Sequence, residues 1–161
     1  MDSFFRKIDP YRAYEWNFVP STGRSGGILC GVKKERFEKV LWKKGRFILQ
    51  VSFYDNKIKN NWTLCTVYGV THYKDKEDFL IELSDFCSHT KTCRKKNKKW
   101  QHSPHFDLFN SVINSMCLSE IHMSGGMYTW TNNQSHPTVE KLDRVLMSSD
   151  WEDIFAQVNI R

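Results

Sequence analysis

Asp143 is the residue with the clearest potential for chemistry, and it lies inside the alternating segment Lys141 to Met147. The leucine and valine residues of that segment are typical of a strand. Burying a carboxylate in such a strand is costly unless it is paired, so we expect a histidine, an arginine or backbone N–H donors beside it. The alternative is a surface charge pair between Asp143 and Arg144, because most charged residues are exposed.

A second candidate is the basic segment His89 to Ser103, HTKTCRKKNKKWQHS. Its cations could contact nucleic-acid phosphates, and Trp100 offers a ring for base stacking. A nuclear-localisation-like cluster and a solvated connector are the alternatives, since like charges at this density repel one another. The candidate nucleic-acid-binding residues are Lys91, Arg94, Lys95, Lys96, Lys98 and Lys99.

Cysteine and histidine residues around this basic segment raise the question of a zinc site. Structural zinc sites use regular ligand spacings, commonly with closely spaced cysteine pairs. No such pattern describes the spacing of Cys87, His89, Cys93, His102 and His105. We therefore predict no metal ligands from this cluster.

The segment Gly23 to Gly27 satisfies G-x-S-x-G, the pattern of a serine-hydrolase nucleophile. That pattern needs a strand before the serine and a helix after it. Here the apolar run Ile28 to Val32 follows, which is typical of a buried strand. We therefore interpret the glycines as a turn that leads into a core strand.

Alternation of apolar and polar residues in some segments, and apolar residues at helical spacing in others, predict an α/β chain. The two expected helices, Asp75 to Cys87 and Phe106 to Leu118, repeat apolar residues at three and four, and Ser103-Pro104 is a start signal for the second. Asn132-Asn133 indicates a turn between the last two strands. The expected strands are Glu15 to Val19, Ile28 to Val32, Arg46 to Tyr54, Trp62 to Tyr68, Tyr128 to Trp130 and Lys141 to Met147.

Composition and charge favour a single globular domain over residues 1–161 with a polyanionic partner, DNA or RNA. Twenty-four Lys and Arg against eighteen Asp and Glu give a formal net charge of +6, which attracts phosphates. No apolar run approaches the roughly 20 residues of a membrane-spanning helix, so we expect no membrane partner. Five cysteines without a C-x-x-C pair indicate reduced thiols in a nuclear or cytoplasmic, intracellular protein.

Five sequence blocks, in order, resemble the endonuclease/exonuclease/phosphatase superfamily, and most closely the endonuclease domain of plant LINE-type retrotransposons. The resemblance extends from about Trp16 to Trp151. Together the blocks are specific, whereas each alone is not. They are Trp16 to Ser21, Gly23 to Leu29, Val67 to Gly69, Tyr128 to Trp130 and Lys141 to Leu146.

This resemblance implies a DNase I-like, two-sheet β-sandwich flanked by helices, and hydrolysis of DNA phosphodiesters with Mg²⁺. It implies that Tyr68 faces the scissile phosphate, where a phenol can donate a hydrogen bond. On residue chemistry alone, a tyrosine at the end of a strand is more often a packing residue. It also implies that Asp143 orients a catalytic histidine near the end of the family's domain.

Three family motifs have no counterpart in this sequence: an upstream metal-binding glutamate, a strand ending in Gly-Gly-Asp-Phe-Asn, and a terminal Ser-Asp-His. The basic linker 89–103 stands where the metal-binding strand would be. We therefore expect a truncated and internally deleted domain, in which endonuclease activity is weak or lost and Mg²⁺ binds poorly. The alternatives are a non-catalytic, basic nucleic-acid-binding protein and an unstable, pseudogene-like product.

Overall fold

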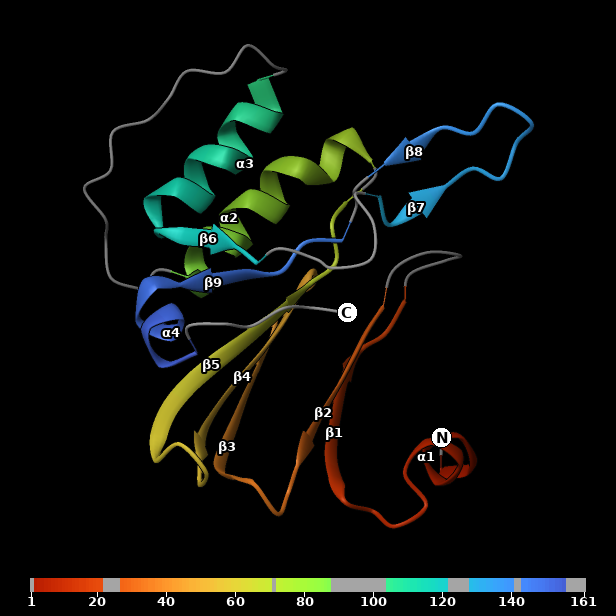
Figure 1. Cartoon of the computed structure of the whole chain (residues 1–161). Coiled ribbons are helices and arrows are strands. Elements are labelled where there is room, and N and C mark those ends of the chain that lie inside the picture. Colours follow the sequence, from red (N-terminus) through yellow and green to blue (C-terminus); the bar gives the residue numbers. More distant parts are fainter. Residues whose placement is uncertain are drawn as a thin grey trace. The chain divides into compact units, whose positions relative to one another are not determined.

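The computed structural model describes residues 2–21, 27–70, 72–87, 104–121, 128–140 and 143–155 (Figure 1). The chain divides into two compact units, Met1–Cys87 and Ser88–Arg161, and each unit is described by itself. Both combine helices with antiparallel strands, which confirms the α/β class. The single domain over residues 1–161 stays a prediction, and the linker 89–103 lies outside the described residues.

The first unit is built mainly from antiparallel strands. The first two strands form a hairpin, and the next three form a sheet in chain order. Each of the four strands expected in this unit is present within two residues of its expected ends. The elements are α1 (Asp2–Ile8), β1 (Tyr14–Val19), β2 (Ile28–Lys33), β3 (Phe37–Lys44), β4 (Ile48–Asp55), β5 (Asn60–Val67), a 3₁₀ turn η1 (Tyr73–Asp75) and α2 (Lys76–Cys87).

The core of this unit lies around β4, which has buried residues on both faces. Val51 and Phe53 form a cluster with Val32 of β2. The Phe53 ring lies 4.4 Å, centre to centre, from the rings of Phe37 and Trp62. Helix α2 lies over one end of the β3–β5 sheet (Figure 1). As its apolar spacing predicts, α2 buries Phe79, Leu80, Leu83 and Phe86.

Asp9 joins the end of α1 to β1. Its carboxylate accepts hydrogen bonds from the backbone N–H groups of Ala13 and Tyr14, at 2.8 and 3.0 Å, and from Trp16 Nε1 at 3.0 Å. Burial alone would raise the pKa of Asp9, but these three donors, with the charge of Lys34, lower it below its ordinary value. The Trp16 ring covers Gly31 on β2, where a Cβ atom would lie 2.6 Å from the ring. A side chain at position 31 would therefore displace the tryptophan.

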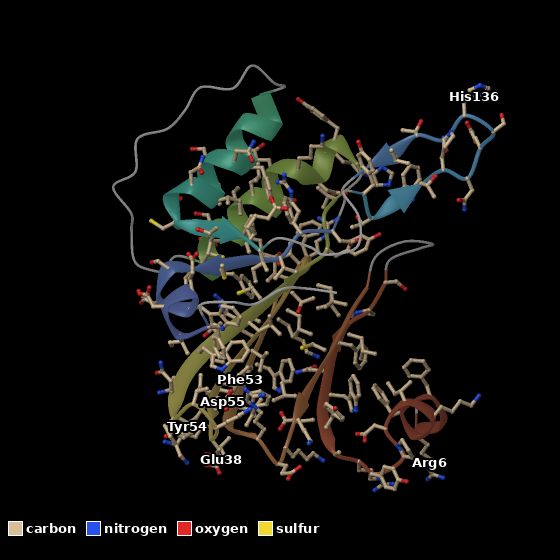
Figure 2. All side chains as sticks on the ribbon, in the orientation of Figure 1. Arg6, Glu38, Phe53, Tyr54, Asp55 and His136 are labelled. Atoms are coloured by element: carbon tan, nitrogen blue, oxygen red, sulfur yellow. The ribbon has the colours of Figure 1, made fainter. Side chains whose placement is uncertain are left out.

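Asp55, at the end of β4 (Figure 2), has a fully buried side chain and forms an ion pair with the partly exposed Arg36. Arg36 Nη2 lies 2.6 Å from Asp55 Oδ2, and Arg36 Nε donates to both carboxylate oxygens at 3.1 and 3.2 Å. The Asp55 carboxylate also accepts a hydrogen bond from the backbone N–H of Lys57 at 2.9 Å. One buried carboxylate thus fixes both the turn before β3 and the turn after β4.

Acid should destabilise this unit through Asp55. The hydrogen bonds from Arg36, opposed by burial and helped by the backbone donors, lower the pKa of Asp55 from 3.8 to about 2. A lowered pKa in the folded state means that the stabilisation is complete above pH 3.8 and is lost as the pH falls toward about 2. We expect the free energy of unfolding, measured by urea titration, to fall in this interval. In the Asp55→Asn variant, the free energy of unfolding should fall less steeply with decreasing pH. The same pH dependence in the variant and the wild-type chain would contradict this assignment.

The second unit contains short elements. Two strand pairs are antiparallel, β6 with β9 and β7 with β8. The helix expected from Phe106 is present and begins at the Pro104 start signal. No helix in the described parts of either unit is long and apolar enough to cross a membrane. The elements are α3 (Pro104–Ser115), β6 (Leu118–Glu120), β7 (Trp130–Thr131), β8 (Val139–Glu140), β9 (Leu146–Ser148) and α4 (Ser149–Ile154).

Candidate functional site

Tyr68 directly follows β5. Its backbone N–H donates to the carbonyl oxygen of Phe47 at 3.0 Å, which extends the pairing of β4 with β5 by one residue. The tyrosine is 40% exposed, whereas Phe47 is only 8% exposed and packs edge-to-face on Phe79. The backbone of Tyr68 is therefore anchored to the core, and its side chain remains accessible to a ligand.

Glu82 of α2 holds the hairpin that supports Tyr68. Its carboxylate accepts hydrogen bonds from three successive backbone N–H groups, those of Arg46, Phe47 and Ile48, at 3.0, 2.9 and 3.0 Å. Hydrogen bonds to an ionised acceptor are stronger than those between neutral groups. Helix α2 thus fixes the β3–β4 turn, and through Phe47 it fixes the position at which Tyr68 leaves the sheet.

Asp143 lies outside any strand and is exposed, so the prediction that it is buried within a strand is wrong, while Lys141 and Leu142 lie outside the described residues. Strand β9 begins only at Leu146. An exposed carboxylate keeps its hydration, so the energetic argument for a histidine or arginine partner no longer applies. The backbone N–H of Asp143 donates to Thr129 Oγ1 at 3.0 Å. This contact joins the Tyr128–Trp130 block to the block that contains Asp143.

The loop between β7 and β8 holds Thr129 and Asp143 on neighbouring segments. Asn132 Oδ1 accepts hydrogen bonds from the backbone N–H groups of Gln134 and Thr138, at 3.3 and 3.0 Å. Asn133 has a positive φ of 52°, a conformation that asparagine tolerates better than most residues. The turn expected at Asn132-Asn133 is confirmed. His136 lies on this loop, away from the strand ends (Figure 2).

Arg144 forms an ion pair with Glu120 of β6, with Nε and Oε2 3.7 Å apart. The surface position assumed by the alternative interpretation, a charge pair between Asp143 and Arg144, is confirmed, but Arg144 pairs with Glu120 among the described residues. The next residue, Val145, accepts a backbone hydrogen bond from Ile121 at 2.9 Å. These contacts continue the β6–β9 pairing toward Asp143 and leave its carboxylate on the surface.

Tyr68 and Asp143 belong to different units, so the structure gives no geometry between them. The six basic candidates, from Lys91 to Lys99, lie outside the described residues, as does the Ser25 of the G-x-S-x-G pattern. Among the described residues, no group of three or more histidine, cysteine, aspartate or glutamate side chains is arranged to hold a metal ion. One exposed carboxylate at Asp143 does not fit a complete Mg²⁺ site, which uses several oxygen ligands.

Two contacts of functional interest were not expected from the sequence. The first is the hydrogen bond from the Asp143 backbone N–H to Thr129 Oγ1. Thr129 is part of the Tyr128–Trp130 block, and its hydroxyl group was a sequence signal for such an acceptor. Cys65 and Cys87 lie together at the end of α2, although their spacing along the chain gives no sign of it. Cys30, Cys65 and Cys87 are not disulfide-bonded, whereas Cys117 is disulfide-bonded, so the expectation of five reduced thiols is wrong at Cys117.

Comparison with known proteins supplies no relative from which residue roles could be transferred. No protein-family model matches the chain, and neither a curated protein nor a solved structure is significantly similar to it.

Proposed function

We propose that this chain is a retrotransposon-derived, endonuclease-like protein that binds DNA phosphates and in which phosphodiester hydrolysis is weak or lost. The observation that carries the proposal is the hydrogen bond between Thr129 and Asp143. It links two of the five sequence blocks on which the family resemblance rests. The aspartate at the family's site position is held by its backbone and is exposed, as a residue that meets a ligand must be.

Tyr68 supports the same proposal from the first unit. The family resemblance assigns a phosphate-facing role to the tyrosine at this position, and here the tyrosine is 40% exposed at the end of an anchored strand. A phenol O–H can donate to a phosphate oxygen without a metal ion. The family's two-sheet sandwich is part of the proposal, and the core cluster of Val32, Val51 and Phe53 between β2 and β4 supports it.

The sequence between α2 and α3 supports the loss of hydrolysis. Residues 88–103 contain no aspartate and no glutamate. In the family, the strand in this interval provides an aspartate and an asparagine that bind the metal and the phosphate. Residues of a catalytic unit act together, so losing some of them removes most of the rate enhancement. Binding through basic side chains does not depend on those residues.

DNA binding should depend steeply on salt. The chain has a net charge of +6, and each phosphate contact releases counterions, so the logarithm of the affinity falls linearly with the logarithm of the salt concentration. We expect replacement of Lys95, Lys96 and Lys98 by glutamine to reduce the magnitude of the slope of log affinity against log salt concentration by about 0.9 per lost phosphate contact. Fluorescence anisotropy with a labelled duplex at several salt concentrations measures this slope.

A variant with the same charge change gives the matched control. Lys57, Lys59 and Lys74 are exposed lysines of the first unit, and their replacement by glutamine should change the slope much less. Equal losses in both variants would show that binding reflects overall charge and not the basic cluster. An affinity that does not change with salt would contradict DNA binding through phosphate contacts.

A further inference from the structure

Three side chains form a row across the β3–β5 sheet, near the end of α2. Lys43 is paired in register with Gln50, and Gln50 with Cys65, so all three lie on the same face. Gln50 Nε2 donates to Cys65 Sγ at 3.4 Å and to the carbonyl oxygen of Phe86 at 3.2 Å. Lys43 Nζ lies 4.1 Å from the centre of the Phe86 ring. The row therefore connects β5 with the last turn of α2.

Cys87, the last residue of α2 and the neighbour of Phe86, completes this cluster, because the Gln50 amide bridges Cys65 Sγ and the Phe86 carbonyl oxygen and the two thiols interact. The hydrogen bond from Cys87, with smaller contributions from Gln50 and Lys43, lowers the pKa of Cys65 to about 7 despite burial. The same hydrogen bond raises the pKa of Cys87. Two thiols in contact, one of them with a lowered pKa, favour oxidation of the first sulfur followed by disulfide formation with the second.

We propose that Cys65 and Cys87 are a peroxide-sensitive thiol pair, in which Cys65 reacts with the oxidant and Cys87 then closes a disulfide. Both residues are only partly buried, so a small oxidant can reach them. The disulfide would join the end of α2 to β5, next to the segment that carries Tyr68. The inference rests on the geometry of the first unit and is independent of DNA binding.

The reaction is a two-electron oxidation of the two sulfurs by hydrogen peroxide. The Cys65 thiolate attacks one peroxide oxygen, the O–O bond breaks, and the leaving hydroxide takes up a proton to form water. The product is a sulfenic acid on Cys65. The Cys87 sulfur then attacks the Cys65 sulfur, an S–S bond forms as the S–O bond breaks, and the Cys87 proton leaves with the hydroxide as a second water.

Peptide mapping after mild oxidation tests the proposal. The whole chain is reduced, freed of reductant, treated with a stoichiometric amount of hydrogen peroxide, blocked with an alkylating agent and digested with trypsin. Trypsin places Cys65 in peptide 60–74 and Cys87 in peptide 77–91, each as the sole cysteine of its peptide. We expect these two peptides to be recovered joined, with the loss of two hydrogen atoms. At pH 7 we also expect Cys65 to be alkylated at least about tenfold faster than Cys30, whose pKa is raised by burial.

Variants separate the two steps. Cys87→Ser should leave the sulfenic acid on Cys65, where dimedone traps it, and Cys65→Ser should abolish both products. Cys30→Ser is the matched control, because it removes another free thiol of the same unit and should leave the joined peptides unchanged. Circular dichroism of each variant checks that it is folded. Oxidation of the folded wild-type chain without the joined peptides, or alkylation of Cys30 as fast as Cys65, would overturn the proposal.

Discussion

Asp55→Ala should lower the free energy of unfolding of the first unit by about 3 kcal/mol, at the lower end of the range for breaking a buried ion pair. The Asp55 side chain is fully buried, while the Arg36 side chain is 38% exposed, so water can hydrate the arginine that is left without its partner. The variant also removes the acceptor for the backbone N–H of Lys57. Urea titration followed by circular dichroism measures the change.

The ion pair between Lys33 and Glu35 provides the control for Asp55. Its side chains are 46% and 82% exposed, so Glu35→Ala should change the free energy of unfolding by less than about 1 kcal/mol. Equal effects of the two substitutions would contradict the role given to Asp55. A broad, non-cooperative transition in the wild-type chain would instead support the alternative of an unstable, pseudogene-like product.

Glu82→Ala should be the second most damaging change, at about 2 kcal/mol, because three backbone N–H groups of the β3–β4 turn lose one charged acceptor. Part of that loss is recovered by water, since the Arg46 end of the turn is exposed. Amide hydrogen exchange at Phe47 and Ile48 should accelerate in the variant. The same change should make the position of Tyr68 less fixed, because the Tyr68 backbone N–H donates a hydrogen bond to the carbonyl oxygen of Phe47.

Asp78 lies on the same helix and contacts the same hairpin, which makes Asp78→Ala the matched control for Glu82→Ala. Its carboxylate is 3.6 Å from Arg46 Nη1, with both side chains more than half exposed. We expect a change of less than about 1 kcal/mol and no faster exchange at Phe47. If both variants accelerated exchange at Phe47 equally, the three hydrogen bonds of Glu82 would not be what holds the turn.

The strands and helices with strong patterns could be predicted from the sequence. The β4 segment combines β-branched and aromatic residues with a polar turn after it, and α2 repeats its apolar residues at helical spacing. Both the helix and the strand are confirmed within two residues. In these segments, local preference and tertiary burial agree, so the pattern alone is sufficient.

Strand β3 and helix α1 were not expected from the sequence, because their local signals are weak. The β3 segment FEKVLWKK carries three lysines, and only Phe37, Val40 and Trp42 contribute to the core cluster. Its strand conformation depends on pairing with β4 and on the pair between Arg36 and Asp55. Such long-range contacts cannot be inferred from alternation within one segment.

The burial of Asp143 was predicted wrongly because its apolar neighbours were assigned to a strand that starts three residues later, at Leu146. A residue that precedes a strand can turn its side chain to water, and then it needs no partner. The contact with Thr129 depends on how two segments 14 residues apart meet. The cysteine pair depends likewise on the register of β5 and on where α2 ends, and neither can be obtained from cysteine spacing.

The central claim, an endonuclease-like protein whose hydrolysis is weak or lost, is tested most directly by nicking of supercoiled plasmid in the presence of Mg²⁺. The samples are the purified chain, the same chain with a chelator, Asp143→Ala, and Asp153→Ala as a control for an exposed aspartate of the same unit. The account predicts that nicking by every sample stays at or barely above the chelator background and does not depend on Asp143. Mg²⁺-dependent nicking by the wild-type chain and by Asp153→Ala, but not by Asp143→Ala, would contradict it and show that the active site is intact.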